Sequence, residues 1–160
     1  MSDIQNLSSA QAVYVAARME QRAVALYERA LMVFAQGRMK DVLQDLLKEE
    51  QAHLRGFQRL QEHEGPVGSE DGLLLDALAG EALFTGGLTG AVREGAFDSP
   101  LSLLRYAADE EERAAARYRQ FAEKATGETK ETFLLIARQE QRHLERLLGQ
   151  IFLMEESLDA

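Results

Sequence analysis

The chain has 160 residues, a formal net charge of −9 and no cysteine, and 46% of its residues are hydrophobic. This length suits one domain with a single core, and the lack of cysteine excludes disulfides, thiolate metal sites and cysteine-held iron–sulfur centres. The acidic balance, with Lys and Arg interspersed among the acids, argues against a nucleic-acid partner, and no apolar run approaches the roughly 20 residues of a membrane span.

Two long amphipathic helices are predicted in the first part of the chain. The first runs from about residue 9 to 36, and the second from about residue 39 to 64. Apolar residues recur every three or four positions on one face of each helix. Glu20 lies within the apolar face of the first helix, and Glu50 and His53 lie within that of the second. A carboxylate on an apolar face is costly to bury unless its charge is compensated.

The segment 65–98 has a different composition and contains eight of the 12 glycines. Short helices are expected at Leu73–Leu78 and at Glu81–Arg93, although Gly86, Gly87 and Gly90 weaken the second. A connection of this length allows the chain to cross from one end of a bundle to the other. We therefore expect the segment to be a crossover between two helical pairs.

A second pair of long helices follows the crossover. One begins at Ser99-Pro100, an N-cap followed by proline in the first turn, and ends near Gly127. The other runs from about residue 128 to 155. Their apolar faces contain Glu111 in one helix and the pair Glu140 and His143 in the other, as in the first two helices.

The two helical pairs form an internal duplication. The pattern Glu20…Tyr27 recurs as Glu111…Tyr118, and Glu50-x-x-His53 recurs as Glu140-x-x-His143. The offsets are nearly constant, at 91 residues for the first Glu and 90 for the second. The candidate turn glycines, Gly37 and Gly127, are also 90 residues apart. Antiparallel helices with these turns bring the four glutamates of the repeated patterns, Glu20, Glu50, Glu111 and Glu140, to a similar height near mid-bundle.

These residue types indicate a metal site. Residues i and i+3 project from one face of a helix, so each Glu-x-x-His offers a carboxylate beside an imidazole. Two such helices plus two single-Glu helices form the ligand set of di-iron and di-manganese carboxylate bundles. Buried carboxylates need a proton, a cation or a metal, and this donor set suits Fe or Mn. The predicted ligands are Glu20, Glu50, His53, Glu111, Glu140 and His143, with Glu50 and Glu140 as bridges.

The predicted fold is all-α. We expect a four-helix bundle made of two antiparallel hairpins and a long crossover connection, forming one domain over residues 1–160. Residues 1–4 lack the basic and apolar parts of a signal peptide, so a cytoplasmic protein is expected.

The duplicated motifs resemble the rubrerythrin-like branch of the ferritin-like superfamily. The resemblance spans both hairpins, over residues 9–64 and 99–155. It implies a non-haem centre with two iron ions per chain, manganese being the alternative, that reacts with hydrogen peroxide or oxygen. It also implies a homodimer. Tyr27 and Tyr118 match family tyrosines that orient the ligand carboxylates, which makes them candidate catalytic residues. The alternative is that they are ordinary core aromatics.

The chain departs from the family pattern in three respects. Without cysteines it has no rubredoxin domain, so its electron donor must be a separate protein such as a rubredoxin. Ala114 stands where rubrerythrins carry an additional glutamate, which puts their redox-linked ligand switch in doubt unless Glu112 substitutes through a register shift. Gln51 stands where bacterioferritin has its haem-ligating Met, so no haem is expected.

Three functions follow from these observations. The first is reduction of hydrogen peroxide or oxygen at a di-iron site, of peroxidase or ferroxidase type. The second is iron storage or handling without a dedicated peroxidase activity, and the third is a structural bundle with a vestigial site. Glu49 and Glu112, which flank the predicted ligands, are expected to face solvent.

Overall fold

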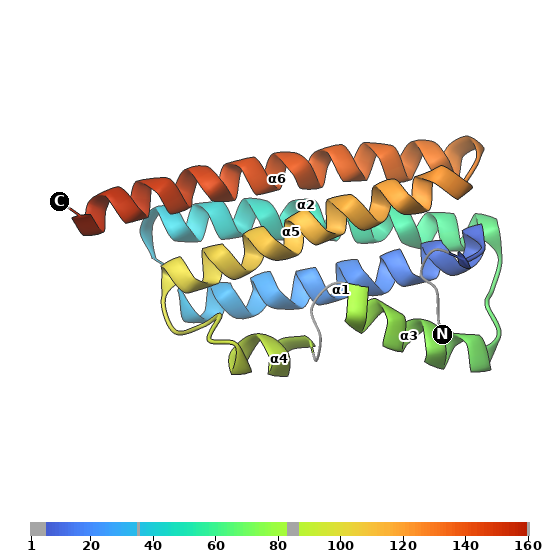
Figure 1. Ribbon diagram of the computed structural model, residues 1–160, viewed down its shortest axis with the longest axis horizontal. Helices are drawn as coiled ribbons and strands as arrows, with labels where there is room; N and C mark the ends of the chain where they lie inside the picture. The colour runs from blue at the N-terminus through green and yellow to red at the C-terminus, as the bar shows by residue number, and fades with distance from the viewer. Residues whose placement is uncertain (1–5, 35, 83–86, 160) are drawn as a thin grey trace.

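The computed structural model describes residues 6–34, 36–82 and 87–159, and every regular element within these ranges is an α-helix. The helices, drawn in Figure 1, are α1 (Ser9–Val33), α2 (Gly37–Glu64), α3 (Ser69–Ala82), α4 (Gly87–Arg93), α5 (Pro100–Lys124) and α6 (Gly127–Asp159). The prediction of an all-α bundle is confirmed.

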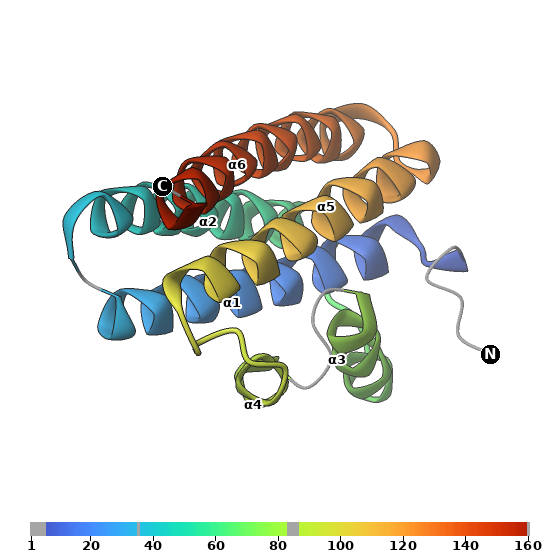
Figure 2. The same cartoon turned by 60° about the vertical axis from the view of Figure 1, so that its left-hand side comes forward.

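The four long helices form the bundle and the two short ones lie outside it. α1 and α2 pair as one antiparallel hairpin, and α5 and α6 pair as the other (Figure 1). α2 and α5 run in the same direction, as a crossover connection requires. In Figure 2 the crossover helices α3 and α4 lie against the outer side of α1, away from α2 and α6.

Local sequence signals set the ends of the long helices. Ser8 and Gln11 form a capping box at the start of α1, with hydrogen bonds of 3.2 and 2.9 Å. The Ser99 hydroxyl accepts from the backbone N–H of Ser102 at the start of α5. Gly37 and Gly127 have φ angles of 60° and 58°, so the two hairpin turns use the left-handed conformation at matched positions.

The turn glycines lie at the starts of helices rather than at their ends, which corrects the predicted boundaries. The prediction ended the first helix at residue 36, but α1 ends at Val33 and is capped by Phe34, whose N–H donates to the Ala30 carbonyl. Likewise α5 ends at Lys124, and Gly127 is the first residue of α6. α6 continues to Asp159, beyond the predicted end at residue 155.

The crossover contains two helices, as predicted, with different bounds. α3 spans 14 residues rather than the expected six, and α4 starts at Gly87 rather than residue 81; residues 83–86 lie outside the described part of the chain. α3 is attached to α1 by a polar cluster, in which the Tyr14 hydroxyl donates to Asp76 (3.0 Å) and Arg18 pairs with the same carboxylate (2.8 Å).

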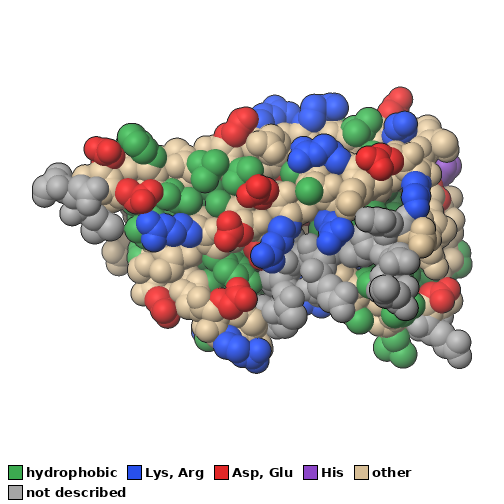
Figure 3. Space-filling model, viewed as in Figure 1, with side chains coloured by type: hydrophobic (Ala, Val, Ile, Leu, Met, Phe, Trp, Pro, Cys, Tyr) green, Lys and Arg blue, Asp and Glu red, His purple; other side chains and the backbone are tan. Residues whose placement is uncertain are grey.

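The surface carries both signs of charge. On the face shown in Figure 3, basic and acidic side chains alternate, with hydrophobic side chains between them. None of the helices in the described ranges has the length and hydropathy needed to span a membrane.

Candidate metal centre

The six predicted ligands converge in the middle of the bundle. α1 contributes Glu20 and α5 contributes Glu111, while α2 and α6 each contribute a Glu-x-x-His pair. All six side chains are buried, with relative exposures of at most 4%: Glu20, Glu50, His53, Glu111, Glu140 and His143. Helical periodicity explains the placement, because each residue lies within the buried face of its helix.

The donor atoms fall into two overlapping groups. One group contains Glu20, Glu50, His53 and Glu140, and the other contains Glu50, Glu111, Glu140 and His143; within each group the atoms lie within 4.8 Å of one another. Each group could hold a metal ion with three carboxylates and one imidazole. Glu50 and Glu140 belong to both groups, which is the arrangement expected of bridging ligands.

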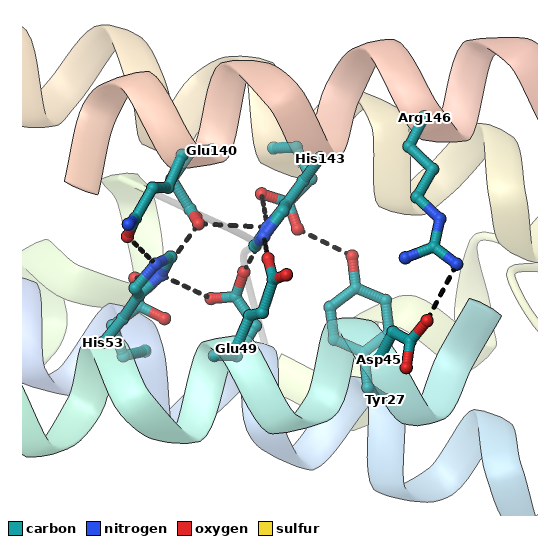
Figure 4. A network of polar contacts seen from close by, with 11 residues as sticks. Tyr27, Asp45, Glu49, His53, Glu140, His143 and Arg146 are labelled. Atoms are coloured by element: carbon teal, nitrogen blue, oxygen red, sulfur yellow. Dashed lines mark hydrogen bonds and ion pairs between the residues drawn. The ribbon is translucent and has the colours of Figure 1, made fainter. Parts of the chain in front are cut away.

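The two imidazoles present the same nitrogen to the carboxylates. His53 Nδ1 lies 2.9 Å from Glu140 Oε1, and His143 Nδ1 lies 2.9 Å from Glu50 Oε1. The rings are nearly parallel, with centroids 5.6 Å apart. Figure 4 shows both rings between α2 and α6, pointing into the carboxylate cluster. The Nδ1 atoms are thus the candidate metal ligands.

The outer nitrogens of the two rings have different partners. His53 Nε2 is hydrogen-bonded to Gln139 Oε1 at 2.7 Å. His143 Nε2 makes a short contact with the Glu49 carboxylate, drawn in Figure 4. Glu49 was expected to face solvent, and its side chain is indeed 54% exposed. Its carboxylate nevertheless reaches across from α2 to α6, so the prediction missed its contact with the site.

Each hairpin contains a tyrosine whose hydroxyl donates a hydrogen bond to a glutamate of the other hairpin. The Tyr27 hydroxyl donates to Glu111 at 2.7 Å, and the Tyr118 hydroxyl donates to Glu20 at 2.8 Å. Tyr118 also packs against Phe57, with ring centroids 5.2 Å apart, in a cluster of aromatic rings. The tyrosines therefore fix the two non-bridging carboxylates and also belong to the core.

Burial sets the protonation of the carboxylates in the metal-free protein. Burial and repulsion from Glu50 raise the pKa of Glu20, and burial and repulsion from Glu140 raise the pKa of Glu111. Burial also opposes ionisation of Glu140, but hydrogen bonds from His143 and His53 outweigh it and lower the Glu140 pKa.

The histidines carry the compensating charge in the metal-free protein. Burial alone would keep both rings neutral, but the surrounding carboxylates outweigh it and raise the pKa values of His53 and His143 far above their usual range. Protons thus offset part of the buried negative charge. A metal ion binding at Nδ1 would displace these protons and take over their role.

The residues present fit a metal centre. Each of the six ligands has a buried polar atom that, in the described part of the chain, contacts only the other charged groups of the cluster and has no hydrogen-bond partner outside it; both oxygens of Glu50 are among these atoms. Buried polar groups are normally satisfied, so a cluster of this kind calls for a ligand. The two carboxylate–imidazole groups match the preferences of Fe and Mn.

Glu110 is a buried acid that the sequence analysis did not single out. Its exposure is 6%, and its Oε2 has no hydrogen-bond partner among the described residues. Burial raises its pKa to about 8, opposed by Arg113 and assisted by Glu94. The sequence contains a signal for its burial, because Glu110 is three residues after buried Ala107 and four before buried Ala114.

Ala114 and Glu112, the residues at which the sequence departs from the rubrerythrin pattern, differ in burial. Ala114 is buried and lines a space of about 10 Å³ between α1 and α5, together with Glu20, Tyr27 and Glu111. Glu112 is exposed, as expected, so no register shift brings it to the site. On the opposite side, Glu49, His53 and Gln139 line a surface depression of about 240 Å³.

Comparisons with known proteins agree with this geometry. Residues 102–159 match the rubrerythrin family, so the matched region runs from the start of α5 to the end of α6. Searches of curated proteins and of solved structures found no match. The matched hairpin contains Glu111, Glu140 and His143, and the first hairpin repeats their pattern in the same buried cluster. Residues 102–159 are therefore similar to the rubrerythrin family, and the described chain as a whole forms a ferritin-like helical bundle.

Proposed function

We propose that the protein is a non-haem di-iron oxidoreductase that reduces hydrogen peroxide or oxygen. The observation that carries the proposal is the pair of overlapping donor groups, each with three carboxylates and one imidazole, that share Glu50 and Glu140. Two ferrous ions would supply the two electrons that, with two protons, convert hydrogen peroxide to two water molecules, and a separate electron donor such as a rubredoxin would reduce the ferric ions again.

The protein's own residues bind the ions and keep water out. Glu20 and His53 would hold one ion, Glu111 and His143 the other, and the two shared glutamates both. The hydroxyls of Tyr27 and Tyr118 orient the non-bridging carboxylates by hydrogen bonds and leave their remaining oxygens for the metals. Full burial strengthens each of these interactions.

The space around the site favours a small oxidant. The void beside Ala114, Glu20 and Glu111 measures about 10 Å³, which is close to the room that one water molecule needs. Hydrogen peroxide and oxygen are of similar size, whereas an organic substrate would require the helices to separate. We therefore expect the oxidant to be hydrogen peroxide or oxygen.

Anaerobic Fe(II) titration followed by stopped-flow oxidation tests the proposal. We expect about two Fe(II) per chain and faster oxidation by hydrogen peroxide than by oxygen. A rate with oxygen equal to or above that with peroxide would assign ferroxidase or oxygen-scavenging activity instead. Failure to bind Fe(II) would overturn the proposal and favour a structural bundle with a vestigial site.

Iron storage is the main competitor, and particle size distinguishes it. Storage requires a cage of many subunits, whereas we propose a homodimer with a mass of about twice the 17.9 kDa chain. Size-exclusion chromatography with mass measurement separates the two outcomes. A large cage that accumulates many irons per chain would replace the oxidoreductase assignment.

A further inference from the structure

The two candidate metal positions differ in the groups behind their histidines. His53 and His143 both direct Nδ1 into the carboxylate cluster and Nε2 outward. Behind His53 the partner is the neutral amide of Gln139, and behind His143 it is the carboxylate of Glu49. Residues 49 and 139 each immediately precede a shared glutamate in the duplicated pattern. Each contacts the outer ring nitrogen of the other hairpin's histidine, but one is a carboxylate and the other an amide.

The chemistry of the outer partner affects the inner nitrogen. An imidazole that donates its Nε2–H to a carboxylate gains electron density at Nδ1 and becomes a more basic metal ligand. An amide oxygen also fixes the ring and its tautomer, but it carries no charge and polarises the ring less. Hydrogen bonds to a charged acceptor are also roughly twice as strong as neutral ones.

We propose that Glu49 makes the two metal positions unequal, so that the position formed by Glu50, Glu111, Glu140 and His143 binds a divalent cation before, and more tightly than, the position containing His53. Glu49 is a positioning residue, since it acts through His143 and lies outside both donor groups. Gln139 plays the equivalent part for the weaker position. The inference rests on the metal centre proposed above.

The surroundings of Glu49 support an effect through the ring rather than direct coordination. The carboxylate contacts His143 Nε2, the nitrogen on the far side of the ring from Nδ1. A neighbouring ion pair between Asp45 and Arg146, at 3.0 Å, also joins α2 to α6 beside this contact (Figure 4). Glu49 is more than half exposed, so an isosteric change to Gln leaves the core packing intact.

Titration of the metal-free protein with Zn(II), a redox-inert probe, tests the proposal. The chain has only three histidines, so ¹⁵N-histidine NMR follows both ligand rings, with exposed His63 as an internal reference. In the wild type we expect the first equivalent to shift the His143 ring and the second to shift His53. Calorimetry should show two resolved steps.

Matched variants separate the effect of the contact from that of charge. Glu49→Gln should weaken the tight step by about 10–100-fold, and Gln139→Glu should tighten the weak step by a similar factor. The double variant Glu49→Gln/Gln139→Glu keeps the net charge and should reverse the order, with His53 shifting first. Glu112→Gln removes the same charge from an exposed position beside Glu111 and should leave the order unchanged.

The outcomes separate this inference from the proposed function. If both rings of the wild type respond together, or if Glu49→Gln leaves the order and both affinities unchanged, the inference is wrong although the metal centre stands. If Zn(II) and Fe(II) bind without shifting either ring, the proposed centre itself is wrong. A reversed order in the double variant is the result that would establish the role of Glu49.

Discussion

The two hairpins of the bundle supply equal sets of ligands but differ at residues beside them. Each hairpin contributes two glutamates, one histidine and one tyrosine, and each tyrosine binds a glutamate of the other hairpin. At the residue before the first glutamate, α1 has buried Met19 where α5 has buried Glu110. At the residue before the second, α2 has Glu49 where α6 has Gln139. The repeat thus keeps the donor atoms and varies the groups around them.

This comparison shows what the bundle requires of each hairpin. The ligands are buried and interdependent, so losing one leaves uncompensated charge in the core. Their neighbours tolerate change because they act through a ligand or lie at the margin of the site. The family match covers only the second hairpin, residues 102–159, although both hairpins meet in one cluster.

Removing the shared ligands should have the largest effect. The Glu50→Ala/Glu140→Ala variant removes two of the three carboxylates from each group, so Fe(II) binding should fall from two equivalents to nearly none. Anaerobic titration with metal analysis measures it. The single variants Glu20→Ala and Glu111→Ala serve as matched tests of hairpin equivalence, because each should abolish one equivalent. Unchanged binding in the double variant would refute the site.

The ligands were predictable because helical periodicity places backbone positions on faces. Glu20 and Glu111 fall within apolar stripes, and the internal repeat, which relates them by 91 residues, selects them from neighbouring acids. Periodicity says less about where a long side chain ends. Glu49 sits outside the stripe, but its flexible chain reaches across the α2–α6 boundary to His143. The packing of α2 against α6 shows this contact, and the periodicity of apolar residues does not reveal how these helices pack.

The remaining errors have similar causes. Gly37 and Gly127 correctly marked the turns, yet a left-handed residue can end one helix or precede the next, so the boundaries shifted by a few residues. The burial of Glu110 was not predicted, although Ala107 and Ala114 mark its face of α5 as buried. A charged residue type does not by itself indicate exposure, because a protonated acid can be buried.

Metal loading should stabilise both hairpins together. An ion that binds only the folded state contributes about 2.7 kcal/mol at a hundredfold excess over its Kd, which corresponds to a rise in Tm of about 5–11 °C for a chain of this size. Calorimetric melting with chelator or with Mn(II) measures the shift. Equal melting temperatures would contradict a buried site, and the Glu50→Ala/Glu140→Ala variant supplies the control that should not respond.

The crossed tyrosines test whether the hairpins are equivalent. Tyr27→Phe removes the donor to Glu111, and Tyr118→Phe removes the donor to Glu20, so each leaves a buried oxygen unsatisfied. Each should lower the free energy of unfolding of the metal-free protein by about 1–3 kcal/mol. Urea denaturation with chelator measures both. Values differing severalfold would show that one cross-link dominates, contrary to the symmetric geometry.

The smallest expected effect comes from Glu110, which has no acidic counterpart in the first hairpin. Its pKa rises from 4.5 to about 8 in the folded, metal-free protein. Because the pKa is higher in the folded than in the unfolded state, the contribution of protonated Glu110 to the free energy of unfolding is fully present below about pH 4.5. This contribution falls as the pH rises from there and is lost once the pH has passed through 8. Glu110→Gln cannot ionise, so it should lose less stability than the wild type between pH 6 and pH 8, by about 1 kcal/mol after allowance for partial solvation. Urea denaturation with chelator at the two pH values gives this difference, and exposed Glu112→Gln should follow the wild type. Parallel pH profiles for Glu110→Gln and the wild type would mean that Glu110 is solvated, and the two hairpins would then differ only at Glu49 and Gln139.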